Sequence, residues 1–336
     1  MYQNLLELPD ISIIIVNYKG WKRLKQCLDS LKLIKDNRFS HEGIIIDNLS
    51  NDGQIEVFIK LYPAFTFIVN SGNLGFASGC NLGAANSQGS FLLFLNPDTI
   101  ISADALFNLL KEVRNRKEFS VISCGQVNED GSMERLHRVF LSVFTATGWL
   151  RALNRLIHRH KEKLFYQTGD YLYPDWVSGS VIMISRESFN GLCGWDEDFW
   201  MYYEDVDLCR RAKQRNGEIV ILKNTTIEHN HGGSSRINLQ TSALTKTEVN
   251  ISRHIFISKH ERGWRAVFIH SILILDNMVL GLPVAIAGTL FFFIRRLNLK
   301  SRVYFKLANY YLESIHSQTW LSKRSVNYNR KIILTH

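Results

Sequence analysis

Six carboxylates and five aromatic side chains are crowded between Cys193 and Arg211, in the segment CGWDEDFWMYYEDVDLCRR. Carboxylates beside large rings are solvated, paired or shifted in pKa, and shifted carboxylates are common proton donors and acceptors in enzymes. The segment leads into a stretch with helical apolar spacing, so the cluster lies at a strand-to-helix junction. This part of the chain therefore predicts acid–base chemistry.

Asp205 is the best candidate for a general base in this cluster. On a helix that starts near Glu204, Asp205 shares a stripe with Leu208, Cys209 and Ala212, at spacings of three, four and seven residues. That stripe faces the protein. A base on it can therefore reach the hydroxyl of a bound substrate and accept its proton. Glu204 has two open interpretations: it orients the base, or it is a negative charge at the helix N-terminus.

Asp207, in contrast, has the spacing of a structural residue. It lies three and four residues before Arg210 and Arg211, which predicts a solvated ion pair on the helix surface. We therefore do not expect Asp207 to take part in proton transfer.

The aromatic residues ahead of this helix could shape a loop for a sugar acceptor. Trp195 and Trp200 offer ring faces on which a sugar can stack, and Asp196 offers a hydrogen-bonding carboxylate. Large rings are as often part of a core, so a core role for the two tryptophans remains open.

A further carboxylate, Asp98 in FLNPD, is placed to bind a metal ion. It follows an apolar run that predicts a buried strand, although residues 96–99 could also form an ordinary turn. A hard divalent cation, Mg²⁺ or Mn²⁺, takes carboxylate oxygens and stabilises a departing diphosphate. His229, or His231 two residues later, could complete such a site with an imidazole nitrogen.

Short apolar runs alternate with helical patterns along the first part of the chain. Helical spacing is clearest for Trp21, Leu24, Leu28 and Leu31. The predicted strands are 11–16, 43–46, 65–69 and 91–95, and two further predicted helices are 54–61 and 76–85. This alternation predicts an α/β fold with a doubly wound, mostly parallel sheet.

Hydrogen-bonding side chains follow each of these four strands. They are Asn17 and Tyr18, Asp47 and Asn48, Asn70 and Asn73, and Asn96 and Asp98. Ligands of doubly wound sheets bind at the carboxyl ends of the strands. Any one pair could be turn chemistry, but their recurrence at four successive strand ends favours a binding site.

Three later elements have clear sequence signals. Ser102 is a predicted N-cap for a helix that runs through Leu110. The run WVSGSVIMIS at 176–185 predicts a strand, and the helix that contains Asp205 is expected to end at Gly217 in a left-handed conformation.

The C-terminal region is apolar and then basic. Residues 278–294 carry no charge over 17 positions, just short of the roughly 20 that span a bilayer. From Arg295 onward, nine Lys or Arg residues stand against one acidic residue, Glu313. A membrane-embedded or interfacial helix pair and a buried helical appendage are both compatible with this pattern. We expect a catalytic domain over 1–250 and a helical, membrane-associating region over 251–336.

Composition limits the other possibilities. The net charge of +9 would fit a nucleic-acid binder, but no arginine-rich run or zinc-ligand spacing accompanies it, so no nucleic-acid partner is expected. The five cysteines are scattered without a C-x-x-C pair, which favours a reducing cytosol. The N-terminal sequence MYQNLLELPD lacks the features of a secretory signal. We expect the protein at the cytoplasmic face of the cell membrane.

Seven motifs between residues 10 and 240 resemble, in order, those of family 2 glycosyltransferases with the GT-A fold. The resemblance is to the bacterial rhamnosyltransferase-like branch, which builds O-antigens and related polysaccharides. The motifs are IIIVNY (13–18), IIIDNLSNDG (44–53), NSGNLGFASGCNLGA (70–84), FLNPD (94–98), WVSGSVIMISRESF (176–189), GWDEDFWMYYEDVDLCRRA (194–212) and HNHGGSS (229–235).

The resemblance implies how a nucleotide-sugar donor binds. Asp47 would contact the nucleotide base, and Asp98 would be the surviving carboxylate of the family's Asp-x-Asp metal motif, which here is Asn96-Pro97-Asp98. The expected donor-binding residues are Asn17, Tyr18, Asp47, Asn73, Gly75 and Asn96. Because one carboxylate is missing from the motif, tight metal binding without the donor is not expected.

The resemblance also implies an inverting reaction. Asp205 matches the family's catalytic base and His229 its histidine beside the metal, so Asp205 would deprotonate the acceptor hydroxyl in a single displacement. The implied donor is dTDP-rhamnose, and the implied acceptor is a polyprenyl-diphosphate-linked sugar. The alternatives are a nucleotidyltransferase acting on sugar phosphates and a non-catalytic membrane-bound scaffold with the same fold.

Overall fold

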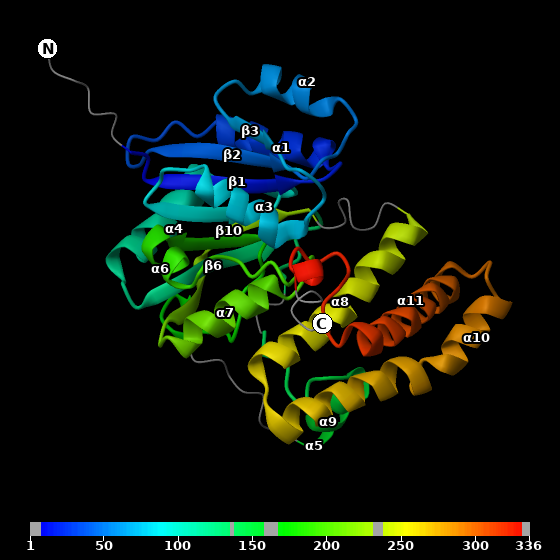
Figure 1. Cartoon of the computed structure of the whole chain (residues 1–336). Helices are drawn as coiled ribbons and strands as arrows, with labels where there is room; N and C mark the ends of the chain where they lie inside the picture. The colour runs from blue at the N-terminus through cyan, green and yellow to red at the C-terminus, as the bar shows by residue number, and fades with distance from the viewer. Residues whose placement is uncertain (1–7, 135–137, 158–166, 231–237, 331–336) are drawn as a thin grey trace, which may run out of the picture. The chain divides into compact units, whose positions relative to one another are not determined.

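A computed structural model of the chain describes residues 8–134, 138–157, 167–230 and 238–330 (Figure 1). The chain forms two compact units, and each is assembled from three stretches of sequence. The first comprises Met1–Arg138, Phe165–Asp196 and Leu208–Gly233, and the second comprises Val139–Leu164, Glu197–Asp207 and Ser234–His336. The boundary that we predicted at residue 250 falls inside a helix of the second unit.

The first unit is built on one mixed β-sheet. Within the described residues the strand order is β3-β2-β1-β4-β9-β6-β10-β8-β7, and β5 pairs with β10. Neighbours from β3 to β4 are parallel, as are β6 and β10, whereas β9 runs antiparallel to β4 and β6. The strands are β1 (Ile11–Asn17), β2 (His41–Asp47), β3 (Thr66–Val69), β4 (Phe91–Leu95), β5 (Thr99–Ile100), β6 (Phe119–Val127), β7 (Gln167–Thr168), β8 (Tyr171–Leu172), β9 (Val181–Ser185) and β10 (Glu218–His229).

Helices alternate with the first strands, which confirms the predicted α/β pattern. They are α1 (Trp21–Lys32), α2 (Gln54–Leu61), α3 (Gly75–Ala85), α4 (Ala103–Asn115) and α6 (Arg186–Gly191). Figure 1 shows α2 beside β3 at one edge of the sheet. Ser102 caps α4 as predicted, because its side-chain oxygen accepts a hydrogen bond from the backbone N–H of Ala105.

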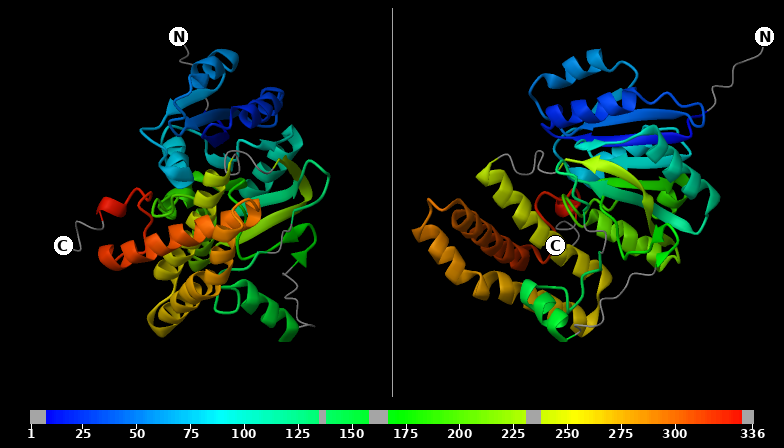
Figure 2. Two further views of the ribbon diagram at one scale, coloured as in Figure 1. Left: turned by 90° about the vertical axis from the view of Figure 1, so that its right-hand side faces the viewer. Right: turned by 180° about the vertical axis from the view of Figure 1, so that it is seen from behind.

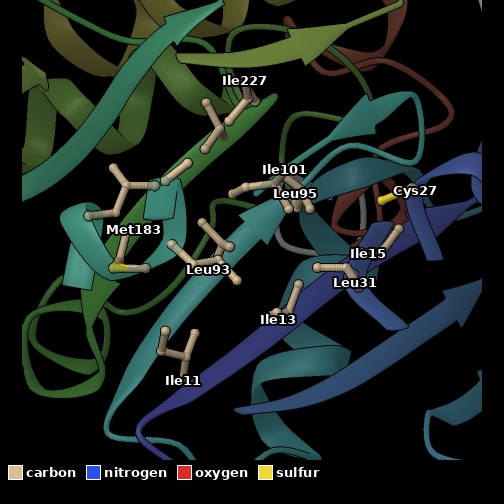
Figure 3. Close-up of a cluster of buried hydrophobic side chains, with 14 of the residues drawn as sticks. Ile11, Ile13, Ile15, Cys27, Leu31, Leu93, Leu95, Ile101, Met183 and Ile227 are labelled. Atoms are coloured by element: carbon tan, nitrogen blue, oxygen red, sulfur yellow. The ribbon is translucent and has the colours of Figure 1, made fainter. Parts of the chain in front are cut away.

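β1 is buried on both faces, which explains its unbroken apolar sequence. Ile13 and Ile15 point to one side, into a cluster that includes Leu31 of α1 (Figure 3). Ile14 points to the other side, where a side chain on Gly83 of α3 would clash with it. Glycine at this position therefore lets α3 approach the sheet closely.

The strand predicted over 176–185 is shorter than its sequence pattern. β9 begins only at Val181, and the residues before it belong to a connection. Ser180 shows the reason, because its carbonyl accepts from the backbone N–H of Asn96 and its hydroxyl donates to Oε1 of Gln126. These bonds tie the connection to the ends of β4 and β6.

The end of α7 (Glu204–Gln214) also differs from the prediction. The left-handed residue after the helix is Asn216, with φ of 61°, and not Gly217. Asparagine tolerates this conformation better than most residues. Glycine is still required at 217 for space, because a Cβ there would overlap the side chain of Ser120.

The second unit is helical in its described part. It contains α5 (Gly148–Ile157), the first turn of α7, α8 (Leu239–His260), α9 (Gly263–Ile274), the π-helical η2 (Leu275–Leu280), α10 (Leu282–Leu290) and α11 (Arg295–Ser317). Figures 1 and 2 show α11 returning alongside α10, and α11 also packs against α8.

One helix of this unit matches a membrane span in length and composition. Among the described residues it is the run Gly263–Leu290, which joins α9, η2 and α10 over 28 residues, and 17% of its most apolar stretch is buried. It begins before the charge-free segment that we predicted at 278–294 and ends within it. The charge-free segment is therefore divided between this helix and the turn after it, where Phe292 and Phe293 are exposed.

Candidate active site

The ends of β1 and β2 meet at Asn17 and Asp47, which are paired in register. Both side chains are buried, and Nδ2 of Asn17 lies 3.4 Å from Oδ1 of Asp47. The carboxylate of Asp47 also accepts hydrogen bonds from the backbone N–H and the hydroxyl of Ser50. These bonds hold the carboxylate in one orientation at the strand end.

A cavity of about 310 Å³ opens beside Asp47. It is lined by Asp47 and Val69 from the strand ends and by residues around the start of α2, including Asp52 and Glu56. Oδ2 of Asp52 accepts a hydrogen bond from Nε1 of Trp21, so that carboxylate is fixed as well. A cavity with this lining suits a small polar group that presents hydrogen-bond donors.

An amide chain joins the next strand ends to the start of α3. Nδ2 of Asn70 donates to Oδ1 of Asn48, and Nδ2 of Asn48 donates to the carbonyl of Gly75. Gly75 has φ of 91°, a conformation that other residues rarely adopt, so glycine is required there. Asn73, two residues earlier, is half-buried in the same connection.

Tyr18 follows β1 and is half-buried, and Nζ of Lys19 lies 5.5 Å from its ring centroid. The backbone N–H of Lys19 donates to the hydroxyl of Ser50. The turns after β1 and β2 are thus linked through one serine, which places Tyr18 on the connection next to Asp47.

The turn after β4 carries Asn96 and Asp98. The carbonyl of Asn96 accepts a hydrogen bond from the hydroxyl of Thr99, and the backbone N–H of Asn96 donates to the carbonyl of Ser180. Asp98 is turned towards β10, where its Oδ1 lies 3.3 Å from Nε2 of His229. The structure therefore brings together the two residues that we predicted as metal ligands, while His231 lies outside the described residues.

His229 is held from both sides of its ring. Nε2 faces Asp98, and Nδ1 lies 2.8 Å from Oε1 of Gln126 and 2.9 Å from Oε1 of Glu134. Burial alone would lower the pKa of His229, but the hydrogen bonds and negative charges of Asp98 and Glu134 outweigh it and raise the pKa to about 9.

Gln126 and Glu134 were not foreseen in the sequence. Gln126 lies near the carboxyl end of β6, which is parallel to β10, so the strand-end rule used for the other residues would have found it. Glu134 had no comparable signal, because the bridge between Val127 and Met133 that brings it back to the sheet forms only in the fold.

The residues present fit a divalent cation in part. Asp98 supplies an oxygen and His229 a nitrogen, and the carboxylate and amide on Nδ1 are the usual partners that orient a metal-binding imidazole. The described residues contain no group of three or more His, Cys, Asp or Glu side chains that could hold a metal. The remaining ligands of a cation here would have to come from substrate oxygens or water.

Glu204 and Asp205 open α7 and belong to the second unit. Glu204 is buried, and its Oε2 has no hydrogen-bond partner in the described part of the chain. Burial and the neighbouring charge of Asp205 raise the pKa of Glu204 well above its usual value. Asp205 is half-buried, and one of its carboxylate oxygens accepts from the backbone N–H of Val206.

The prediction that Asp207 is solvated is wrong. Its side chain is 1% exposed, and Oδ1 accepts a hydrogen bond from Nε2 of His260, 2.7 Å away. The three-and-four spacing to the arginines did not show that α8 would bring a histidine against the first turn of α7. Arg211 donates to the carbonyls of Leu192 and Gly194.

Trp195 and Trp200 are both buried. The ring of Trp195 packs edge-on against Phe76 and Phe94, and Arg324 lies over the ring of Trp200. Of the two roles that the sequence left open, this packing favours the core role. Asp196, by comparison, is half-exposed.

A family model described as Glycosyl transferase family 2 matches residues 12–186, which is more than half of the chain. The chain belongs to this family. The matched part of this family 2 glycosyltransferase contains Asn17, Asp47 and Asp98, whereas Asp205 and His229 lie beyond it.

Curated relatives of the glycosyltransferase are named as hexosyltransferases or rhamnosyltransferases. The low-salt glycan biosynthesis hexosyltransferase Agl10 of Haloferax volcanii is 28% identical over 62% of this chain, and the match spans 63% of the relative, which is under two thirds of its length. The N-acetylglucosaminyl-diphospho-decaprenol L-rhamnosyltransferase of Mycobacterium tuberculosis is 24% identical over 76% of this chain and 86% of its own. Rhamnosyltransferase WbbL of Escherichia coli is 26% identical over 60% of this chain and 76% of its own.

Solved structures share the fold. The mannosyltransferase PcManGT of Pyrobaculum calidifontis, in complex with GDP-Man and Mn²⁺, has a TM-score of 0.52 and 12% identity over 98% of this chain and 87% of its own. GalNAc-T7, solved with UDP, GalNAc and Mn²⁺, has a TM-score of 0.51 and 16% identity over 73% of this chain and 48% of its own. These similarities support the expected GT-A fold.

Proposed function

We propose that this glycosyltransferase moves a sugar, with inversion, from a nucleotide-sugar donor to a hydroxyl of a lipid-linked glycan in cell-surface polysaccharide synthesis. The observation that carries the proposal is the pairing of Asp98 with His229 at the ends of β4 and β10. Carboxylate and imidazole meet there on the same sheet edge as the buried Asp47, where an α/β sheet binds its ligand.

The donor nucleotide would bind along the strand ends. Asp47 would accept hydrogen bonds from the base in the cavity of about 310 Å³, since its carboxylate is oriented by Ser50. Asn17, Tyr18 and Asn96 would line the rest of the path, with Asn73 and Gly75 at the start of α3.

Asp98 and His229 would hold Mg²⁺ or Mn²⁺, with the donor diphosphate completing the coordination. The bound cation would stabilise the negative charge of the leaving nucleoside diphosphate. Gln126 and Glu134 would keep Nε2 of His229 directed at the site through their contacts with Nδ1.

Asp205 would be the catalytic base. Burial and the charge of Asp205 raise the pKa of Glu204, so of these two neighbours Asp205 is the better candidate for the ionised group. Asp205 can then accept the proton of the acceptor hydroxyl as the new bond forms. Asp196 would contact the acceptor, while Trp195 and Trp200 would hold the loop in shape.

The finer assignment is L-rhamnose from dTDP-rhamnose, transferred to a polyprenyl-diphosphate-linked sugar. Two of the curated relatives are named as rhamnosyltransferases, and one name contains a diphospho-decaprenol acceptor. The same strand-end residues would serve any nucleotide sugar, so the choice of sugar depends on the donor and acceptor contacts.

The helical unit would attach the enzyme to the cytoplasmic face of the membrane. Besides the apolar helix Gly263–Leu290, α5 has Trp149, Leu153 and Leu156 exposed at spacings of four and three residues, which forms one apolar stripe. A helix with such a stripe lies well in a lipid interface.

A donor screen tests the reaction. Purified enzyme would be incubated with dTDP-rhamnose, UDP-sugars or GDP-sugars, with a lipid-linked acceptor and either Mn²⁺ or EDTA, while nucleoside diphosphate release is recorded. Release from one donor, lost with EDTA and in Asp98→Ala, would establish the function and name the sugar. Release of inorganic diphosphate from nucleoside triphosphates would support the nucleotidyltransferase alternative, and silence with every donor and acceptor would support a scaffold.

Membrane attachment is tested by sedimentation with liposomes. The double variant Leu153→Asp and Leu156→Asp should sediment less than the wild type, because charge on α5 opposes insertion. Leu33→Asp is the matched control, since Leu33 is 81% exposed in the first unit. Equal sedimentation of all three proteins would show that α5 does not contribute to membrane attachment.

A further inference from the structure

A second cavity, of about 400 Å³, lies within the helical unit among α8, η2, α10 and α11. Three basic side chains line it: Lys246 and Arg253 from α8, and Lys300 from α11. They face one carboxylate, Asp276. The cavity therefore carries an excess of positive charge.

Within the described residues, little of this positive charge is neutralised by a carboxylate. Oδ1 of Asp276 accepts from Nε1 of Trp149, 3.1 Å away. Arg253 donates from one terminal nitrogen to Oδ1 of Asn250, 3.4 Å away, but its Nε is buried without a hydrogen-bond partner in the described part of the chain. Lys246 and Lys300 are exposed at the cavity, and within the described residues neither forms an ion pair. Donors of this kind gain most from a charged acceptor such as phosphate.

Apart from Asn250, Asn277 and the hydroxyl of Tyr304, the rest of the cavity wall is apolar. Val249 of α8, Val284 of α10 and Leu307 of α11 line the cavity. Leu280, which directly precedes the lining residue Gly281, is 53% exposed and presents an apolar surface beside the cavity. A ligand with an anionic end and an apolar chain would match both the cavity and this surface.

The backbone is irregular where the helix passes the cavity. η2 is π-helical over Leu275–Leu280 and contains Asp276, and Pro283 lies one turn later. Proline cannot donate a backbone hydrogen bond, so it interrupts the ladder of the helix. Short π-helical segments inside α-helices occur frequently at functional sites.

We propose that this cavity binds the diphosphate of the lipid-linked acceptor, with Lys246, Arg253 and Lys300 as its phosphate contacts. The apolar chain then leaves the cavity past the exposed Leu280 at the end of η2. The inference rests on the proposed lipid-linked acceptor, and it adds a binding site for the lipid end of that substrate.

The cavity can be tested with three matched probes. Farnesyl diphosphate has both the charged end and an isoprenoid chain, farnesol has only the chain, and inorganic pyrophosphate has only the charge. Binding to the full chain would be measured by calorimetry in EDTA, which removes metal-dependent binding of diphosphates at the donor site. Farnesyl diphosphate should bind at least tenfold more tightly than either of the others.

Variants decide whether this cavity is the binding site. The double variant Lys246→Ala and Lys300→Ala should weaken binding of farnesyl diphosphate about tenfold or more, because two charged contacts are lost. Lys246→Arg with Lys300→Arg should retain binding, and Lys306→Ala, an exposed lysine of α11 outside the cavity lining, should not change it. Unchanged circular dichroism would show that the variants fold.

Three results would overturn the inference. Equal binding by the wild type and the double alanine variant would exclude the cavity. Equal binding of pyrophosphate and farnesyl diphosphate would mean that the site takes free phosphate. If vesicles of anionic phospholipid displaced farnesyl diphosphate completely, the cavity would be a site for bulk lipid headgroups.

The proposed reaction can fail independently of this site. Asp98→Ala should abolish sugar transfer and leave the binding of farnesyl diphosphate unchanged. Absence of transfer with intact, lysine-dependent binding would reject the proposed function alone, and transfer without such binding would reject only the cavity assignment.

Discussion

Nε2 of His229 lies 3.3 Å from Oδ1 of Asp98, which joins the last residue of β10 to the turn after β4. The two strands are separated in the sheet by β9 and β6. The turn reaches across this distance because β5, which follows Asp98 directly, pairs antiparallel with the end of β10. Thr99 lies opposite His229 in that pairing, so the residue before it, Asp98, is brought within reach of the histidine.

Removing the carboxylate behind His229 should weaken metal binding. In Glu134→Gln the imidazole loses one of its two orienting partners on Nδ1, so Mn²⁺ affinity in the presence of dTDP should fall about tenfold or more. Calorimetry with Mn²⁺ measures this directly. Glu129→Gln, at an exposed glutamate paired with Arg23, is the control, and equal affinities for the two variants would contradict the arrangement.

Asp205→Asn should separate chemistry from donor binding. Asparagine keeps the shape of the side chain but cannot take the proton of the acceptor, so kcat should fall at least about 100-fold. The Kd for the donor nucleotide should stay at the wild-type value in a binding titration. A variant that keeps most of its kcat would show that another group is the base.

Glu248 should make the stability of the helical unit depend on pH. Burial raises the pKa of Glu248 to about 7, against the smaller opposing effects of Ser322, Arg324 and Lys306. Between the unfolded pKa near 4.5 and the folded pKa near 7, the folded state holds a proton that the unfolded state releases. Stability should therefore fall as pH rises through this range, by about 3 kcal/mol.

Urea unfolding of the wild type and Glu248→Gln at about pH 5 and about pH 8 tests this expectation. The glutamine variant should show a flatter profile, because it has no proton to lose. Glu313→Gln, at an exposed glutamate paired with Lys323, should keep the wild-type profile. The same change of stability with pH in all three proteins would show that Glu248 is not the cause of the pH dependence.

Gly83→Ala should destabilise the first unit by about 1–3 kcal/mol, because the added methyl group overlaps Ile14 and forces α3 away from β1. Gly148→Ala is the matched control: nothing lies near its Cβ position at the start of α5, so its effect should be small. Chemical unfolding measures both. Equal stability of the two variants would show that α3 can shift without loss.

Much of the first unit follows from local sequence. The apolar run of β1 and the helical spacing of α1 depend on residues a few positions apart, and the structure has both elements where they were expected. The strand-end residues Asn17, Asp47 and Asp98 were equally accessible, because parallel strands deliver their carboxyl ends to one edge whatever the rest of the chain does.

The partners of those residues depend on contacts between distant segments. Glu134 reaches His229 only because the chain turns back after β6, and Asp207 is buried only because α8 brings His260 against it. Nothing in the spacing of Asp207 to the arginines distinguishes a solvated helix face from one that another helix covers. Local patterns therefore determined which elements form and which residues end them, whereas packing between remote elements decided burial, pairing and pKa, since these arise only when the chain has closed around each side chain.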